Sequence, residues 1–119
     1  MTDETSGTPL ISVIVPIRNE AAHIASTLQQ LLEQERSGID LEILVADGRS
    51  TDQSCEIVNS LAEKHPEIRL FDNPLKLSSP ARNVGIQNAS GQYLVVVDGH
   101  CEIPTRTYFI DLLSAFNRT

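Results

Sequence analysis

The feature that most constrains this chain is a regular alternation of short apolar runs with stretches of helical periodicity. The strand-length runs are residues 10–15 (LISVIV), 41–46 (LEILVA), 68–71 (IRLF) and 93–97 (YLVVV). The stretches between them space apolar residues three or four positions apart, as at Ile24, Leu28 and Leu31. Strands that alternate with helices predict βαβ units. The expected fold class is therefore α/β, with a mostly parallel sheet flanked by helices.

Turn and capping residues mark where these elements are expected to begin and end. Pro16 is expected to end the first strand, because it cannot donate a ladder hydrogen bond. Ser50 and Gln53 have the spacing of a capping box ahead of the second helix. Ser79 followed by Pro80 predicts a third helix, with a hydroxyl cap before a proline at the first helical position. The first and fourth strands are almost wholly apolar, which predicts strands covered on both faces.

Length and composition favour one folded unit. A chain of 119 residues with 40% hydrophobic residues is able to bury roughly two-thirds of its unfolded surface around one core. Residues 1–9 are polar and acidic, so we expect a short disordered leader before a domain spanning residues 10–119. The last predicted helix, Tyr108 to Phe116, has an apolar stripe with little sequence after it. We therefore expect the chain to be the front piece of a longer protein.

Charge and cysteine spacing exclude several classes of protein. Asp and Glu total 16 against 9 Lys and Arg, and the resulting net charge of −7 argues against nucleic acid and anionic membrane partners. No apolar run approaches the roughly 20 residues that span a bilayer, and the start lacks a signal-peptide pattern. Cys55 and Cys101 lack CxxC spacing, so we expect small buried thiols in a reducing cytoplasm.

Polar clusters follow three of the four predicted strands. They are residues 16–20 (PIRNE), 47–52 (DGRSTD) and 98–100 (DGH). Each has a purely local interpretation, as a strand stop with a helix cap or as an Asp-Gly turn. The carboxyl ends of parallel strands, however, meet at one edge of the sheet, where α/β folds bind ligands. Taken together, the three clusters predict a binding crevice.

Arg82, together with Asp98 and His100 of the third cluster, indicates what the crevice would bind. Arg82 would lie in the first turn of a helix, where a cation opposes the helix dipole unless an anionic ligand is present; a solvated surface arginine is the alternative. Asp98 and His100 offer a carboxylate and an imidazole, which suit Mn²⁺ or Mg²⁺ with water and phosphate in the other positions. Zinc at His100 and Cys101 is disfavoured, because no second pair of Cys or His has ligand spacing.

These motifs and their order resemble the N-terminal, nucleotide-sugar-binding half of the family 2 inverting glycosyltransferases with the GT-A fold. The resemblance extends from about Ser12 to Phe116 and is carried by SVIVPIRNE, ILVADGRSTDQS and SSPARNVGIQNASGQYLVVVDGH. It implies a Rossmann-like nucleotide-diphospho-sugar transferase fold, of which this chain is the N-terminal part. The DxH form of the last motif is similar to exopolysaccharide-building members of the succinoglycan biosynthesis type.

The resemblance also implies roles for residues of the nucleotide site. Pro16, Asn19 and Glu20 match a loop that lies against the nucleoside, and Arg18 occupies the variable position between them. Arg82 matches a residue near the base and the phosphates.

Two positions depart from the family pattern. Asp47 matches an aspartate that contacts the base, usually uracil, but Gly48 stands where the family often has a second aspartate. Asp98 matches the first aspartate of the DxD motif, near the ribose and the metal. His100 stands in place of the second, which is the usual metal ligand. Three possibilities remain for this position: His100 binds Mn²⁺, another residue does, or the metal is held more weakly.

The implied activity is metal-assisted transfer of a sugar from a nucleoside-diphosphate sugar, typically a UDP-hexose. The acceptor would be a saccharide or lipid-linked molecule in polysaccharide biosynthesis, and the anomeric carbon would be inverted. The family's general base, acceptor site and any membrane helices lie downstream of the DxD motif. The resemblance thus implies a cytoplasmic chain, attached to the inner face of the cell membrane only through sequence absent here.

Two other classes of function remain as alternatives. One is a nucleotide-sugar-binding module without catalysis. The other is a receiver-like signalling domain, which would need an acidic pair after the first strand, where this chain has Pro16.

Overall fold

A computed structural model of the chain describes residues 8–117, so most of the predicted leader, residues 1–7, lies outside the described part. The elements follow in the order β2 (Leu10–Ile17), α1 (Ile24–Leu32), β3 (Asp40–Asp47), α2 (Ser54–Lys64), β4 (Ile68–Asp72), α3 (Ser78–Asn88), β5 (Tyr93–Val96) and α4 (Tyr108–Asn117). The predicted alternation of strands and helices is confirmed. Among the described helices, none is long and apolar enough to cross a membrane.

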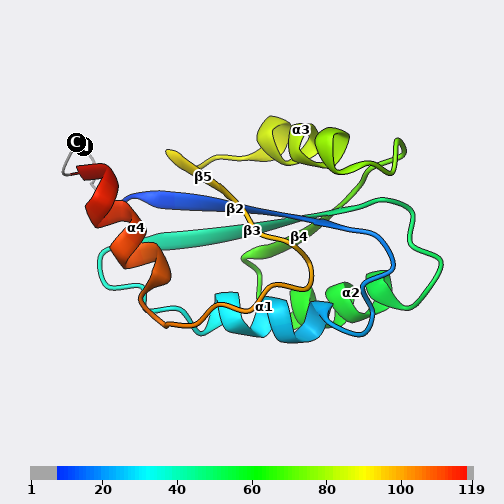
Figure 1. Cartoon of the computed structure of the whole chain (residues 1–119), viewed down its shortest axis with the longest axis horizontal. Helices are drawn as coiled ribbons and strands as arrows, with labels where there is room; N and C mark the ends of the chain where they lie inside the picture. The colour runs from blue at the N-terminus through cyan, green and yellow to red at the C-terminus, as the bar shows by residue number, and fades with distance from the viewer. Residues whose placement is uncertain (1–7, 118–119) are drawn as a thin grey trace.

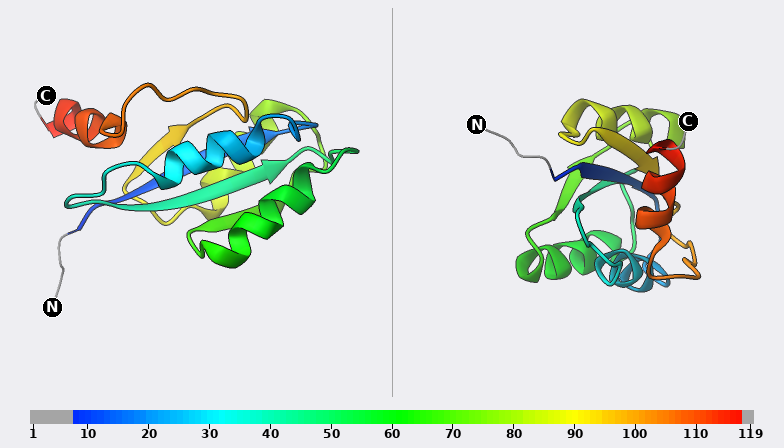
Figure 2. Two further views of the ribbon diagram at one scale, coloured as in Figure 1. Left: turned by 90° about the horizontal axis from the view of Figure 1, so that it is seen from below. Right: turned by 90° about the vertical axis from the view of Figure 1, so that its left-hand side faces the viewer.

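The four strands form one parallel sheet in the order β4-β3-β2-β5. Helices α1 and α2 cover one face of the sheet and α3 covers the other, as Figures 1 and 2 show. The chain moves outward from β2 to β3 and β4, and then returns to the other side of β2 to form β5. The α/β prediction is confirmed, and the topological switch point lies between β2 and β5, where such folds bind ligands.

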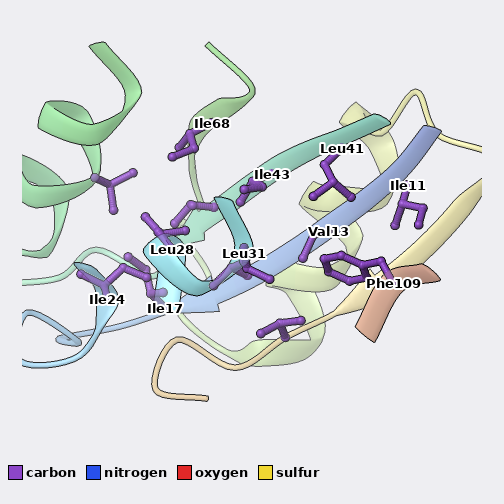
Figure 3. Packing of buried hydrophobic residues seen from close by; sticks show 14 of the residues in the cluster. Ile11, Val13, Ile17, Ile24, Leu28, Leu31, Leu41, Ile43, Ile68 and Phe109 are labelled. Atoms are coloured by element: carbon purple, nitrogen blue, oxygen red, sulfur yellow. The ribbon is translucent and has the colours of Figure 1, made fainter. Parts of the chain in front are cut away.

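The largest apolar cluster lies between the sheet and helix α1 (Figure 3). Alternate residues of β2 contribute to it, and they are Ile11, Val13, Val15 and Ile17. Leu28 and Leu31 of α1 pack against them, and Phe109 of α4 joins the cluster without any exposed surface. Each such side chain contributes roughly 1.5–3 kcal/mol by leaving water. The helical stripe in the sequence is therefore the face that fixes α1 on the sheet.

Two expectations about the strands are wrong. The first strand continues through Pro16 to Ile17 instead of ending at Pro16. Its pairing with β5 stops at Ile14, so the missing N–H of Pro16 lies beyond the last paired residue on that side. Strand β5 is an edge strand, with Leu94 and Val96 46% and 45% exposed, because within residues 8–117 only β2 pairs with it and α3 packs on β2, β3 and β4 instead. It is thus not covered on both faces.

The predicted helix caps are also wrong, since both helices begin elsewhere. Helix α3 begins at Ser78, which makes Pro80 its third residue, and the cap position is occupied by Leu77 without a side-chain bond. Helix α2 begins at Ser54, and Gln53 forms no side-chain cap. The two cysteines are half-buried rather than fully buried.

Candidate functional site

The three predicted clusters come together at the carboxyl edge of the sheet. In Figure 1 the carboxyl ends of β2 and β3 lie on the right. Ile17 at the end of β2 pairs with Asp47 at the end of β3. Across the switch point, Glu20 Oε2 lies 2.8 Å from His100 Nδ1. Residues that are 80 positions apart in sequence are therefore in direct contact at this edge.

Asn19 joins the loop after β2 to the loop after β3. Its Oδ1 accepts hydrogen bonds from the backbone N–H of Thr51 at 2.7 Å and of Asp52 at 3.3 Å. Its own N–H donates to Ser50 Oγ at 2.8 Å, and Ser50 Oγ donates to Asp47 Oδ1 at 2.5 Å. Asn19 also has a positive φ of 56°, which asparagine tolerates better than most residues. The Asn19 side chain thus holds the loop after β2 against the loop after β3.

A second link between these loops runs through Ser54 and Asp52. Ser54 Oγ accepts a hydrogen bond from the Glu20 N–H at 2.9 Å and donates to Asp52 Oδ1 at 2.5 Å. The Ala21 N–H donates to Asp52 Oδ2 at 3.1 Å. The bond from Ser54, with backbone N–H donors, holds the pKa of the Asp52 carboxyl below its usual value. The backbone that carries Glu20 is therefore held in place from the side of α2.

Asp47 is buried at the end of β3. It lines a pocket of about 280 Å³ together with Cys55 and Asp72. Burial, followed by the hydrogen bond to Asp47 and nearby carboxylates, raises the pKa of the Cys55 thiol to about 11. Asp47 therefore holds local structure through Ser50 and Cys55 at the position where the resemblance implied a base contact.

The raised pKa of Cys55 predicts a slowly reacting thiol. In a Cys101→Ser variant, which leaves Cys55 as the sole thiol, iodoacetamide at pH 8 should react about 100-fold more slowly than with a free cysteine peptide, because the thiolate is the nucleophile. Mass spectrometry of the time course measures the rate. An additional Asp47→Asn change should speed the reaction, and a Cys55 rate equal to that of the peptide would contradict this picture.

Gly48 permits close contact between the loop after β3 and the loop after β4. A Cβ at this position would lie 2.9 Å from the Lys76 carbonyl oxygen and 3.2 Å from Lys76 Cα. Real Cβ atoms are essentially never found so close to backbone. The position where the family often has a second aspartate is therefore too crowded here for any side chain.

A pocket of about 180 Å³ lies between the loop after β2 and the start of α3. It is lined by Pro16, Ile17, Arg18, Glu20, Asn73, Lys76, Leu77, Ser78 and Ala81. Three of the predicted site residues, Pro16, Arg18 and Glu20, lie in this lining. Asn73, Lys76 and Ser78 were not predicted from the sequence.

Asn73 is the most informative of the unpredicted residues. Its side chain is 1% exposed, and its Nδ2 donates to the Leu77 carbonyl at 2.9 Å. Since that carbonyl only accepts, the amide orientation is fixed and Oδ1 is the free acceptor. Within residues 8–117, Oδ1 is a buried oxygen without a partner, at a cost of roughly 1–3 kcal/mol. A ligand N–H would remove this cost. The turn-forming Asp-Asn-Pro sequence after β4 was the available signal.

Three cations lie at or beside this pocket. Arg18 and Lys76 line it, and Lys76 has a positive φ of 69°. Arg82 is exposed and does not line the pocket; its Nη2 donates to Ser79 Oγ at 3.2 Å in its own helix. Among the described residues, no carboxylate forms an ion pair with any of the three. Local positive charge is thus available to an anion despite the net charge of −7.

The Asp98-Gly99-His100 turn approaches the first loop closely. A Cβ on Gly99 would lie 2.7 Å from Ile17 Cγ2, so the approach depends on glycine. The hydrogen bond and charge of Glu20, with a smaller effect of Asp98, raise the pKa of His100. The carboxylate of Glu20 therefore stabilises the protonated form of the ring relative to an isolated histidine.

Asp98 and His100 are the side chains that could hold the divalent cation implied by the resemblance. In the part of the chain that the structure describes, no three His, Cys, Asp or Glu residues are placed to hold a metal. Asp98 and His100 supply two donors. Mn²⁺ and Mg²⁺ are commonly held by one or two protein carboxylates, with water and substrate phosphates in the other positions. The pair thus fits a metal completed by a ligand, and not a closed structural zinc site.

A parallel sheet with converging polar loops at its carboxyl edge is typical of α/β domains that bind ligands at that edge. The comparison with protein families makes the class specific. Residues 12–119 match the model of glycosyl transferase family 2, and the chain belongs to this family.

Relatives of known sequence agree with this assignment. An uncharacterized glycosyltransferase of Haemophilus influenzae is 37% identical over 91 residues, covering 76% of this chain and 36% of that protein. The succinoglycan biosynthesis protein ExoA of Rhizobium meliloti is 32% identical over 104 residues, covering 86% of this chain and 31% of that protein. The chain therefore spans about a third of the length of these relatives.

Solved structures show the same fold. A mannosyltransferase from Pyrobaculum calidifontis, in complex with GDP-Man and Mn²⁺, has a TM-score of 0.82 and 30% identity, covering 91% of this chain and 32% of that structure. TarS 1–349 of S. aureus, in complex with UDP-GlcNAc, has a TM-score of 0.77 and 26% identity, covering 91% of this chain and 31% of that structure. The predicted fold, the N-terminal part of GT-A, is confirmed.

Proposed function

We propose that this chain forms the donor-binding part of a glycosyltransferase that uses a nucleoside-diphosphate sugar, with a UDP-hexose as the preferred donor. The observation that carries the proposal is the pocket at the carboxyl edge of the sheet, lined from the loops after β2 and β4. One of its lining residues, Glu20, contacts His100 of the Asp98-Gly99-His100 turn. The mannosyltransferase complex with GDP-Man and Mn²⁺ and the TarS complex with UDP-GlcNAc support it by likeness.

In this proposal the nucleoside lies in the pocket of about 180 Å³. Pro16 supplies an apolar wall, and Asn73 Oδ1 accepts an N–H of the base, which satisfies its buried oxygen. Arg18 and Lys76 donate to the ligand's oxygens. Asn19, Asp47 and Gly48 act indirectly, by holding the loops in place. Arg82 reaches the phosphates only after turning away from Ser79, and its contact stays a prediction.

Asp98 and His100 would hold Mn²⁺ or Mg²⁺ next to the diphosphate. When bound, the cation supplies Lewis-acid stabilisation of the negative charge on the leaving diphosphate. A bound cation also reverses the sign of the local field, which reconciles an acidic chain with an anionic ligand. Arg18 and Lys76 add positive charge on the pocket side of Glu20.

The full reaction is proposed for a longer protein, since the chain spans about a third of the length of its relatives. We propose that the longer protein inverts the anomeric carbon and transfers the sugar to a saccharide or lipid-linked acceptor in exopolysaccharide synthesis, at the cytoplasmic side of the membrane. The 119-residue chain is then a binding module by itself, and it should bind donor without turning it over. Family membership leaves the receiver-like alternative without support.

Calorimetric titration with UDP and GDP, with and without Mn²⁺, tests the binding step. We expect a dissociation constant below roughly 1 mM for at least one nucleotide. Replacing Asn73 with alanine should weaken that binding about 10-fold, because one buried hydrogen bond is lost. Asn83→Ala is the matched control, since Asn83 is exposed on α3 and outside the pocket. Absence of binding by any nucleotide up to millimolar concentration would contradict the proposal.

A further inference from the structure

The contact between Glu20 and His100 has a specific chemical consequence. Glu20 Oε2 lies 2.8 Å from His100 Nδ1, and the Glu20 side chain is 19% exposed against 60% for the imidazole. A carboxylate only accepts hydrogen bonds, so the neutral ring carries its proton on Nδ1. The lone pair of Nε2 is then free. Histidines that bind metals usually donate their other ring N–H to a carboxylate or carbonyl, which fixes the ring and its tautomer.

The turn that carries His100 is held from below by helix α1. Thr27, which is fully buried, donates from Oγ1 to the Gly99 carbonyl at 2.9 Å. The Cys101 N–H donates to the Asp98 carbonyl at 3.2 Å and closes the turn. Asp98 and His100 therefore project from a backbone with little freedom.

The chain segment after this turn is attached to the same helix. Gln30 Oε1 accepts the Ile103 N–H at 2.6 Å, and Gln30 Nε2 donates to the Cys101 carbonyl at 3.3 Å. On the opposite side, the absent side chain of Gly99 leaves room for Glu20, whose Cγ would lie 3.1 Å from a Cβ there. Glu20 is itself fixed by its backbone bond to Ser54. Both partners of the Glu20–His100 contact are thus placed before any ligand arrives.

We propose that Glu20 is a positioning residue for the metal site, which presents His100 Nε2 beside Asp98 as a nitrogen–oxygen donor pair that favours Mn²⁺ over Mg²⁺. The inference rests on the proposed function, because it takes the cation to bind at Asp98. Mg²⁺ prefers oxygen ligands, whereas Mn²⁺ accepts imidazole more readily. The replacement of the second aspartate by His100 then changes which metal is preferred without removing the site.

The tautomer of His100 tests the first half of this inference without metal or nucleotide. Two-dimensional ¹H–¹⁵N NMR of the imidazole rings, at a pH where His100 is neutral, distinguishes Nδ1–H from Nε2–H. We expect the Nδ1–H form for His100 in the unmodified chain. A predominant Nε2–H form would overturn the inference. Because no variant is involved, loss of folding cannot obscure the result.

Metal affinity tests the second half. Free Mn²⁺ is measured by electron paramagnetic resonance in the presence of UDP, and Mg²⁺ by competition. Glu20→Gln should weaken Mn²⁺ binding about 10-fold, in the range found for other outer-shell partners. Glu102→Gln removes the same charge two residues from His100 without that hydrogen bond, and should change the affinity less than about 2-fold. His100→Asp should shift the Mn²⁺ to Mg²⁺ preference about 10-fold toward Mg²⁺.

The outcomes separate this inference from the proposed function. If the unmodified chain binds UDP and Glu20→Gln matches Glu102→Gln in Mn²⁺ affinity, Glu20 has no positioning role and the inference is overturned. The same holds if His100→Ala leaves Mn²⁺ affinity unchanged. Failure of the unmodified chain to bind UDP, with or without metal, would instead contradict the proposed function.

Discussion

Replacing Asp98 with alanine is expected to abolish the Mn²⁺-dependent gain in nucleotide affinity. Asp98 is the only carboxylate of the Asp98–His100 donor pair, and His100 alone leaves the cation without a negatively charged ligand. We expect UDP binding in the presence of Mn²⁺ to weaken about 100-fold, or roughly 3 kcal/mol, on the scale of metal-ion charge stabilisation. Binding without Mn²⁺ should change little, because Asp98 does not line the nucleoside pocket.

The control is Asp40→Ala, which removes the same charge at the start of β3, on the opposite edge of the sheet. Titration calorimetry at one ionic strength compares the two variants. Equal losses in both would indicate a general effect of net charge and would contradict a metal site at Asp98.

Replacing Gly85 with valine is expected to produce the largest loss of stability. Gly85 lies on α3 against β2, and a Cβ there would lie 2.6 Å from both Cγ1 and Cγ2 of the fully buried Ile14. Neither atom is the flexible end of a side chain, so α3 has to move outward. We expect a decrease of about 3 kcal/mol in the free energy of unfolding, measured by urea denaturation.

The matched control is Gln87→Val, at an exposed position of the same helix, which isolates the helix propensity of valine. Nucleotide affinity should also fall in Gly85→Val, because Ser78 and Ala81 at the start of α3 line the pocket. Equal stability of the two valine variants would show that α3 does not approach β2 as closely as described.

The elements of the fold were predictable because hydrophobic spacing is a local property of the sequence. Every predicted strand and helix is present, with shifted ends. The errors have a common cause in tertiary context. Pro16 stays within β2 because β5 pairs only as far as Ile14. The apolar composition of β5 suggested burial, whereas its position at the edge of the sheet leaves Leu94 and Val96 exposed.

The candidate site was predictable in place but not in detail. Parallel topology brings strand ends together, which places the loop after β2 beside the Asp98-Gly99-His100 turn at one edge. Asn73 and Lys76 were missed because the β4–α3 loop reaches the pocket only through its close packing on Gly48. That contact is a property of three-dimensional packing, whereas the Asp-Asn-Pro sequence signals only a turn after β4.

Other residues were found in the expected place with a different local environment. Asn19 Oδ1 accepts a hydrogen bond from a backbone N–H of the loop after β3, and Arg82 donates a hydrogen bond within its own helix. The Glu20–His100 contact spans 80 residues and had no signal in either motif alone. The roles of these residues toward a ligand stay predictions.

NMR titration of the ¹⁵N-labelled chain with UDP and Mg²⁺ shows whether a nucleotide binds at the carboxyl edge of the sheet, between the loops after β2 and β4 and beside the Glu20–His100 contact. We expect the largest amide shifts in the loops after β2 and β4, residues 16–20 and 73–78, and at Gly99 and His100. Shifts confined to the amino edge of the sheet, around Leu10 and Asp40, or no shifts at saturating UDP, would contradict nucleotide binding at the carboxyl edge.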